Sequence, residues 1–443
     1  MTSFKNEIGK QVLILDGAMG TMVQNLGLTD TAFGGPEFKM LTDLLVFSRP
    51  DDLEGIHLEY LQAGANLIET DTFGASPLRL KEFNFSKFDP SDLKAIPDQL
   101  DMKTCSLESL TLELNIEGCR IAKRAIEKYR AQPDYDGRPL FVAGSIGPSN
   151  YVVSSTEANL NKGTFGQIVE NFYHQVLGLV EGGADVLLIE TQQDILETKA
   201  IIAGANKAFA EKKKKLPMIV QATVDVFSKM QIFNTDIHAA YTAVSKMGID
   251  VFGINCNVGP EEMLATVEKL SRFCKHPISV VPNAGQPISE DGQTCYKLSP
   301  EDMANTMEPF VREYGVSIVG GCCGTTPAHI KALREKLNGV VPAPRQPDKK
   351  VYVSGPQEAV PIDTSKGLLR IGERLNVRGS KLVRDAVEKE GEEISMQVLE
   401  EVVNEQVKDL GIEIIDVCMD SNIVETEEVL PAIIHGLTSD FKG

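Results

Sequence analysis

Residues 317–330 have the sequence SIVGGCCGTTPAHI. A short apolar run leads into glycines that flank two adjacent cysteines, and the residues after them have the composition of a helix start. A buried strand, a loop and a helix in this order form the repeating unit of a parallel α/β fold. A disulfide between Cys322 and Cys323 is not expected, because adjacent cysteines cannot reach the bond geometry without strain. The pair is therefore either two small buried apolar side chains or two free thiols with a chemical use.

Seven other apolar runs precede this one, and each ends in small or polar residues before a helix-like segment. Continuous apolar runs are typical of parallel strands that are covered on both faces. Eight such units over roughly 330 residues predict an α/β fold, a closed (βα)8 TIM barrel, with a doubly wound open sheet as the alternative. The runs are VLILDG (12–17), NLIETDT (66–72), LFVAGSIG (140–147), VLLIET (186–191), PMIVQATV (217–224), VFGINC (251–256), PISVVPNAG (277–285) and SIVGGCC (317–323).

Composition limits the class of protein. The chain has 443 residues, which suggests two or three domains, and a formal net charge of -19, which disfavours nucleic acid and anionic membrane as partners. Its eight cysteines follow no disulfide framework, and the N-terminal residues contain no apolar signal core. We therefore expect a cytoplasmic protein with free thiols and without a membrane span.

Chemistry in a barrel of this kind belongs at the carboxyl ends of the strands. Cys256 ends the sixth apolar run, and Cys322 and Cys323 end the eighth, so the two backbones should lie roughly 10 Å apart. Three thiolates that reach across this gap would suit zinc, which in catalytic sites takes three protein ligands and keeps a fourth position open. Other polar residues at predicted strand ends are Asp16, Glu69, Asp71, Glu190 and Asn283.

Several motifs together resemble the homocysteine S-methyltransferase domain, as it occurs at the N-terminus of cobalamin-dependent methionine synthases. They are ILDGAMGTMVQ, GANLIETDTFGAS, GSIGPSN, ADVLLIETQQDILETKA, FGINCNVGPEEM, VPNAGQPI and IVGGCCGTTPAHIKAL. The resemblance implies that Cys256, Cys322 and Cys323 bind zinc. It also implies that Asp16, Gly17 and Glu190 surround the amino-acid end of homocysteine, although each carboxylate alone could equally be a helix cap or a solvated strand end.

The function implied by this resemblance is zinc-dependent methyl transfer to the thiol of homocysteine, which gives methionine. Methylcobalamin is the expected donor, and a corrinoid protein or a missing module would supply it, since no D-x-H-x-x-G signature of a cobalamin module is present. One alternative is a methyltransferase that uses betaine or S-methylmethionine. Another is a non-catalytic zinc-binding partner subunit.

Other thiols and the histidines are not expected to enter the mechanism. None of the six histidines follows a metal-binding spacing, and His329 should lie on the first turn of the last barrel helix. The polar segment 84–104 is expected to be a surface loop. Cysteines without metal-ligand spacing, expected to be structural, are Cys105, Cys119, Cys274 and Cys295.

The sequence predicts three parts: the barrel at 1–342, a proline-bearing linker at 343–364, and 365–443 as the incomplete beginning of a second α/β barrel. The third part contains LLRIGERLNVRGSKLVRDAV and GIEIIDVCMD, which resemble the start of a pterin-binding domain. That resemblance places Asn376, Asp416 and Asp420 near a pterin. Methyltetrahydrofolate would bind only with a complete second domain.

Overall fold

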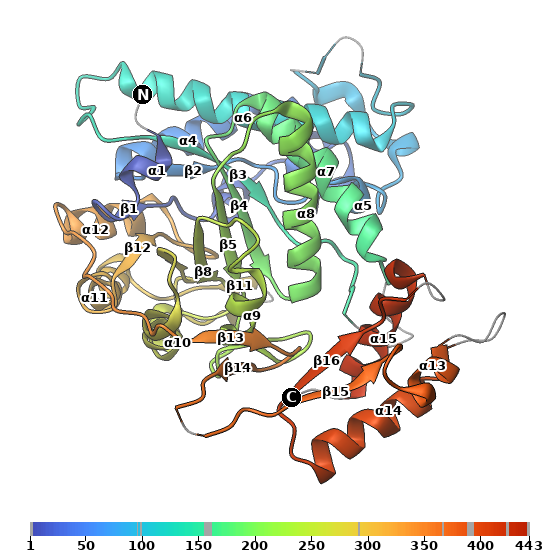
Figure 1. Ribbon diagram of the computed structural model, residues 1–443. Helices are drawn as coiled ribbons and strands as arrows, with labels where there is room; N and C mark the ends of the chain where they lie inside the picture. The colour runs from blue at the N-terminus through green and yellow to red at the C-terminus, as the bar shows by residue number, and fades with distance from the viewer. Residues whose placement is uncertain are drawn as a thin grey trace.

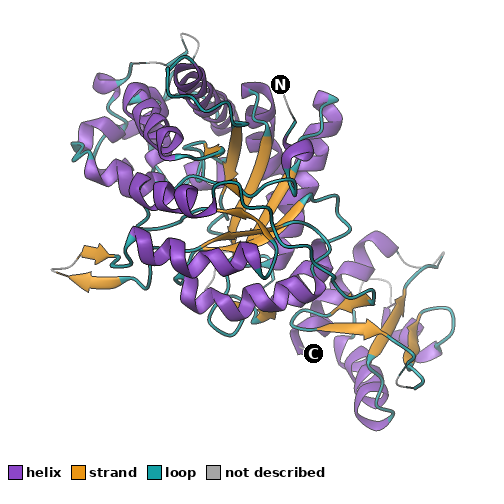
Figure 2. Cartoon of the chain, turned by 90° about the vertical axis from the view of Figure 1, so that its left-hand side faces the viewer, coloured by secondary structure: helices purple, strands orange, loops and turns teal. Residues whose placement is uncertain are grey.

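Eight parallel strands form one sheet at the centre of the N-terminal part of the chain (Figures 1 and 2). The computed structural model describes residues 3–94, 96–97, 100–154, 162–290, 293–365, 367–387, 394–421 and 425–440. Around the sheet the strand order is β1-β12-β9-β8-β5-β4-β3-β2. The strands are β1 (Leu13–Ile14), β2 (Leu67–Glu69), β3 (Phe141–Ile146), β4 (Val186–Gln192), β5 (Met218–Ala222), β8 (Val251–Asn255), β9 (Ile278–Val281) and β12 (Val316–Val319).

The first strand closes the sheet into a barrel. On one side Leu13 pairs with Ile318 of β12. On the other side Leu15 pairs in parallel with Leu67 of β2, and the Asp16 N–H donates to the Leu67 carbonyl at 3.0 Å. The predicted TIM barrel is confirmed, and the open doubly wound alternative is wrong because β1 bonds to both of its neighbours.

A helix follows each strand and covers the outside of the barrel. Good capping fixes several helix starts; for example, Thr164 and Gln167 form a reciprocal capping box at the start of α7. The prediction for His329 is confirmed, since it lies on the first turn of α12. The outer helices are α4 (Pro50–Ala63), α6 (Leu107–Arg130), α7 (Phe165–Gly182), α8 (Ile195–Lys212), α9 (Ile237–Val244), α10 (Pro260–Phe273), α11 (Pro300–Arg312) and α12 (Pro327–Leu337).

Short elements occupy the loops between these strands and helices. They are α2 (Met19–Asn25), η1 (Asp30–Phe33), η2 (Pro36–Phe38), η3 (Thr42–Leu44), α3 (Leu45–Ser48), α5 (Pro77–Leu80), η4 (Phe85–Lys87), η5 (Pro90–Asp92), β6 (Lys229–Met230), β7 (Thr235–Asp236), β10 (Ile288–Glu290) and β11 (Gln293–Cys295). The segment 84–104 is not only a polar surface loop, as the sequence suggested. Phe85 and Phe88 are buried, and their rings pack on Phe38 at centroid distances of 5.3 Å.

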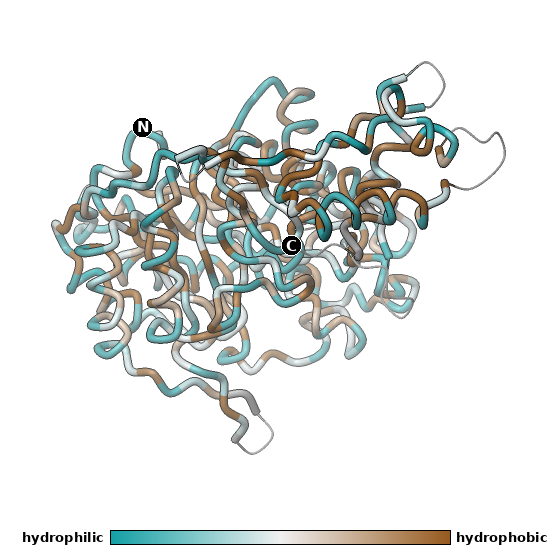
Figure 3. The backbone as a smooth tube through the Cα atoms, turned by 60° about the horizontal axis from the view of Figure 1, so that its bottom comes forward, coloured by the Kyte–Doolittle hydropathy of each residue, from teal (hydrophilic) through white to brown (hydrophobic). Residues whose placement is uncertain are grey.

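The inside of the barrel changes from apolar to polar along the strands. Alternate residues point inward, and the inward positions near the strand starts form an apolar cluster that includes Phe141 and Leu188. Helix α1 (Phe4–Glu7) covers this end, where Phe4 packs edge-on against Phe141. In Figure 3 hydrophobic and hydrophilic stretches alternate along the chain of the barrel. Toward the carboxyl ends the inward positions become polar, with Ser145 and Glu190 as examples.

The predicted linker contains a hairpin that packs on the barrel. Strands β13 (Val351–Ser354) and β14 (Ala359–Ile362) pair antiparallel and lie beside α9 (Figure 1). The Arg345 guanidinium donates to the carbonyls of Cys274 and His276. The ring of His238 lies between Phe273 and Tyr352. These contacts attach residues 345–362 to the barrel wall.

The C-terminal residues form a parallel β–α–β unit with its own small core. Strand β15 (Ile371–Asn376) pairs in parallel with β16 (Ile414–Cys418). The unit also contains α13 (Lys381–Val387), α14 (Met396–Asn404), the π-helical turn Glu405–Asp409 and α15 (Thr426–Asp440). Its core includes Leu375, Leu399 and Ile433. Among the described residues, no helix combines the length and the apolar character that crossing a membrane would require.

The hairpin generates a prediction about the domain boundary. A chain that ends at residue 342 should have a free energy of unfolding at least about 2 kcal/mol lower than a chain that ends at 364, because it loses several hydrogen bonds and a partly buried ring contact. Denaturant unfolding of the two truncated chains measures the difference. Equal stabilities would show that 345–362 is only a tether.

Candidate metal and substrate site

Three cysteines meet at the carboxyl ends of β8 and β12. The Sγ atoms of Cys256, Cys322 and Cys323 all lie within 4.8 Å of one another. Cys323 Sγ is 3.8 Å from Cys256 Sγ and 3.9 Å from Cys322 Sγ. One strand, β9, lies between β8 and β12, as the sequence predicts. The structure therefore brings the three predicted ligands together.

Two left-handed backbone conformations and two closely packed glycines position these sulfurs. Cys256 itself has a left-handed φ of 61°, and Gly324 has a φ of 77°. Gly320 and Gly321 are needed for space and not for a positive φ. A Cβ on Gly320 would lie 2.7 Å from Leu15 Cβ, and one on Gly321 would lie 2.4 Å from a Thr325 methyl.

Ionisation of one of these thiols disfavours ionisation of the other two. Hydrogen bonds from Cys256 and Cys322 lower the pKa of the Cys323 thiol. Hydrogen bonds to Cys256 and Cys323, together with burial, raise the pKa of Cys322 well above its ordinary value. Mutual repulsion of partly buried thiolates explains this division, and a bound divalent cation would remove it.

Three carboxyl groups share the same end of the barrel: Asp16 and Glu190, which are buried, and Glu69, which is partly buried. Burial and then the charge of Glu190 raise the pKa of Asp16 well above its ordinary value, and Glu69 is affected in the same way. Burial raises the pKa of Glu190 to about 7, against a hydrogen bond from Ser145 that lowers it. In the part of the chain that the structure describes, no lysine, arginine or histidine is close enough to neutralise them.

The hydrogen bonds of these carboxyl groups leave acceptor capacity open. Asp16 Oδ2 accepts the Glu69 N–H at 3.0 Å, while the buried Oδ1 has no partner among the described residues. Glu190 accepts from Ser145 Oγ at 2.5 Å and from Asn255 Nδ2 at 3.5 Å. Gly17 has no room for a side chain, since a Cβ there would lie 2.8 Å from Thr325 Oγ1. This cluster is suited to a cationic group such as an ammonium.

Several residues at the site were not singled out from the sequence. Glu69 was placed only at a strand end, although the tetrapeptide LIET occurs at both 67–70 and 188–191 and could have paired it with Glu190. Tyr296 was missed: its ring lies over Gly324, and its hydroxyl hydrogen-bonds to Cys323. Nothing in the local sequence marks Tyr296, because it arrives from the β10–β11 hairpin.

The predicted pterin residues lie in the C-terminal unit. Asn376 is opposite Cys418 in the β15–β16 register, and Asp416 precedes Cys418 by two residues on the same face. Asn376 Oδ1 accepts the N–H groups of Arg378 and Gly379, so it shapes the turn before α13. Asp420 lies 3.6 Å from the Arg378 guanidinium at the surface. Their role toward a pterin stays a prediction.

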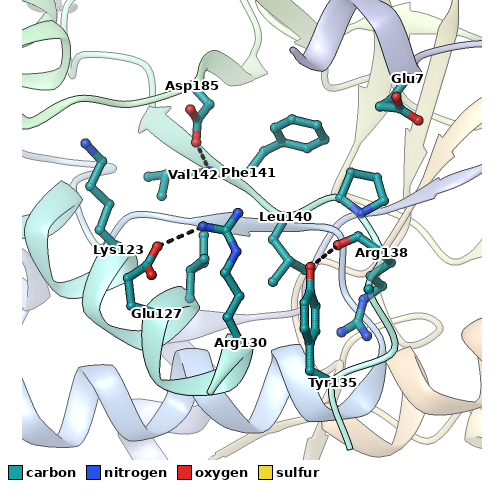
Figure 4. Close-up of a pocket in the computed structure, with 13 residues that line it drawn as sticks. Glu7, Lys123, Glu127, Arg130, Tyr135, Arg138, Leu140, Phe141, Val142 and Asp185 are labelled. Atoms are coloured by element: carbon teal, nitrogen blue, oxygen red, sulfur yellow. Dashed lines mark hydrogen bonds and ion pairs between the residues drawn. The ribbon is translucent and has the colours of Figure 1, made fainter. Parts of the chain in front are cut away.

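A cavity of about 800 Å³ lies at the opposite end of the barrel, next to the strand starts (Figure 4). Its polar groups are largely used within the fold. Asp185 accepts the Val142 N–H, Arg130 pairs with Glu127, and the Tyr135 hydroxyl donates to the Arg138 carbonyl. The cavity is therefore separate from the cysteine site.

Comparison with known proteins agrees with the geometry. The family model of homocysteine S-methyltransferase matches residues 13–337, which include all three cysteines and all three carboxyl groups. The chain belongs to the homocysteine S-methyltransferase family. Methionine synthase of Mycobacterium tuberculosis is 33% identical over 419 residues, and methionine synthase of Mycobacterium leprae is 32% identical over 424 residues. Each match covers 95% of this chain and 32% of the relative, so the chain spans about a third of their length.

Solved structures share the fold of this methyltransferase family member. The metallated form of the homocysteine methyltransferase MmuM from Escherichia coli superposes with a TM-score of 0.55 at 22% identity, over 74% of this chain and 96% of MmuM. Its oxidized form gives a TM-score of 0.53 at 23% identity, over 73% and 96%. At this identity the likeness supports the barrel architecture alone.

Glu190 generates a prediction about pH. Its raised pKa means that the folded chain holds this proton more tightly than the unfolded chain. The protonated Glu190 carboxyl group therefore makes its full contribution to the free energy of unfolding below about pH 4.5, and this contribution is lost as the pH rises through about 7. In metal-free protein, Glu190→Gln should be about 1 to 3 kcal/mol more stable than wild type at pH 8 and nearly equal at pH 5. Urea unfolding at both pH values tests this. A variant that is less stable at pH 8 would mean that a cation already holds the carboxylate.

Proposed function

We propose that this chain binds zinc through Cys256, Cys322 and Cys323 and transfers a methyl group to the thiol of homocysteine, which gives methionine. The observation that carries the proposal is the meeting of two unlike subsites at one end of the barrel. One is a three-sulfur cluster, and the other is a cluster of three carboxyl groups, two buried and one partly buried, without a cationic partner among the described residues. Homocysteine carries a thiol and an ammonium group, so it can occupy both.

The sulfur cluster fits zinc. Tetrahedral ligands at about 2.3 Å from a zinc ion are separated by about 3.8 Å, and the two closest Sγ pairs are 3.8 and 3.9 Å apart. Three protein thiolates leave one tetrahedral position for the sulfur of the substrate. Zinc, when bound, would lower the pKa of the homocysteine thiol so that the reactive thiolate is present at neutral pH.

The carboxyl groups bind and orient the other end of homocysteine. Asp16 Oδ1 is buried without a hydrogen-bond partner among the described residues, and an ammonium donor would satisfy it. Glu190 is close enough to Cys323 for the two charges to interact. One small molecule could therefore reach both subsites. Gly17 keeps this space free of a side chain. Fixing both ends holds the sulfur in the orientation needed for attack.

Methyl transfer is then a direct displacement. The homocysteine sulfur attacks the methyl carbon, a sulfur–carbon bond forms, and the bond from that carbon to the donor breaks with its electron pair staying on the donor. The thiol proton is released to solvent water before the attack. The chain contributes positioning and a cationic site for the thiolate, and no covalent bond to the protein is needed.

Methylcobalamin is the donor that we favour. The matched relatives are methionine synthases, and the likeness to them covers 95% of this chain, so it extends through most of the C-terminal β–α–β unit. A corrinoid protein or module would present the methyl group at the open end of the barrel. Betaine and S-methylmethionine are the alternative donors, and a zinc-binding partner subunit without turnover is the alternative role.

Loss of one sulfur should disable the metal site. Cys256→Ser, Cys322→Ser and Cys323→Ser should each reduce bound zinc and abolish methyl transfer, because the site needs three thiolates. Elemental analysis of the purified variants measures the zinc. Cys274→Ser, which removes a buried thiol outside the cluster, should retain it. Full zinc occupancy in all three cluster variants would contradict the assignment.

The donor can be identified by direct assay. Zinc-loaded wild-type chain with homocysteine should form methionine from free methylcobalamin and not from betaine or S-methylmethionine, with product measured by mass spectrometry. Methionine from either of the latter two would replace the proposed donor. Homocysteine binding without product from any donor would favour the role of partner subunit.

A further inference from the structure

Left-handed backbone conformations occur at two strand ends that face the site. Thr191 at the end of β4 has a φ of 58°, and Cys256 and Asn257 after β8 have φ values of 61° and 68°. Such values are unusual for any residue with a side chain and especially for a β-branched one such as Thr191. Backbone strain of this kind persists only where surrounding contacts determine it.

The left-handed Thr191 belongs to a β-bulge. Along β4 and β5, Ile189 pairs with Val220 and Gln192 pairs with Ala222, so Glu190 and Thr191 together face one residue of β5. A bulge next to a site changes the direction of a side chain. Here it sets the direction of the Glu190 carboxyl group.

The carboxamide of Asn255 holds this bulge. Asn255 Oδ1 accepts the Thr191 N–H at 2.9 Å, and Nδ2 donates to Thr191 Oγ1 at 2.8 Å. The same Nδ2 lies 3.5 Å from Glu190 Oε2. Asn255 is fully buried, so water does not compete for these bonds.

Asn255 also directly precedes the cysteine at the end of β8. Its carbonyl accepts from Thr223 Oγ1 at 3.0 Å, and the next N–H, that of Cys256, donates to the Val281 carbonyl at 3.0 Å. Hydrogen bonds therefore hold the Asn255 backbone beside the sulfur cluster and the Asn255 side chain beside Glu190. It connects the two subsites through a short path of hydrogen bonds.

We propose that Asn255 is a positioning residue that sets the separation between the thiol subsite and the ammonium subsite, and so selects thiols that carry an amino-acid group. This inference rests on the proposed function. A purely structural role of Asn255 would affect the binding of every thiol, whereas the positioning role affects only ligands that engage both subsites. A thiol that engages the sulfur cluster alone should be insensitive to Asn255.

The test compares two thiols on zinc-loaded wild type and Asn255→Ala. Homocysteine affinity, measured by calorimetry, should fall about 10- to 100-fold, the usual effect of losing hydrogen bonds at a charged group. The affinity for 2-mercaptoethanol, which has no ammonium group, should be unchanged when measured by competition. Zinc content should also be unchanged. Asn115→Ala is the matched control, since it truncates an equally buried asparagine on α6, and both affinities should remain as in wild type.

A second variant tests the path through the bulge. Thr191→Val removes the Oγ1 acceptor, and the double variant with Asn255→Ala should bind homocysteine no more weakly than Asn255→Ala alone. Additive losses would overturn the proposed path. Three results for Asn255→Ala would overturn the inference: unchanged homocysteine affinity, an equal loss of affinity for both thiols, or loss of zinc. The proposed function would stand in each case as long as the wild type binds homocysteine. A wild type that does not bind homocysteine would overturn the proposed function itself.

Discussion

Closure of the barrel by its first strand is the constraint on which the site depends. Strand β1 is only two residues long, yet the backbone around it bonds to β12 on one side and to β2 on the other. The Gly321 N–H also donates to the Asp16 carbonyl at 3.1 Å. Residues separated by more than 300 positions in sequence are therefore held beside each other by main-chain hydrogen bonds, which do not depend on any flexible side chain.

The closed barrel then gathers groups of like charge. Carboxyl groups and thiols that would each be unremarkable at a surface lie together in one layer of the barrel, where burial and neighbouring groups raise the pKa values of Asp16, Glu69 and Cys322. Such an arrangement lowers the stability of the empty protein as the groups ionise. Cations that enter would compensate this loss, which is a physical reason why the proposed site would take a metal and an ammonium group together.

The same layer explains why backbone strain is concentrated there. An ordinary strand end would send neighbouring side chains to opposite faces. The bulge at Thr191 and the left-handed turn at Cys256 instead turn selected side chains toward the open end of the barrel. Asn255 stabilises the bulge at Thr191 and directly precedes the left-handed turn at Cys256. Contacts within the rigid sheet therefore offset the free-energy cost of both strained conformations.

The sequence by itself determined the repeating strand–helix order and which three cysteines lie at strand ends, and it favoured a closed barrel over an open sheet, because apolar runs and strand ends can be recognised locally. The family resemblance added Asp16, Gly17 and Glu190. Only the tertiary structure decided that Glu69 joins these carboxyl groups, that Tyr296 lies over the sulfur cluster and that residues 345–362 pack on the barrel. Those features depend on pairing distant segments and on the direction of individual side chains. Local periodicity specifies which residues face inward, but the distance between two strand ends is set by the closure of the whole sheet.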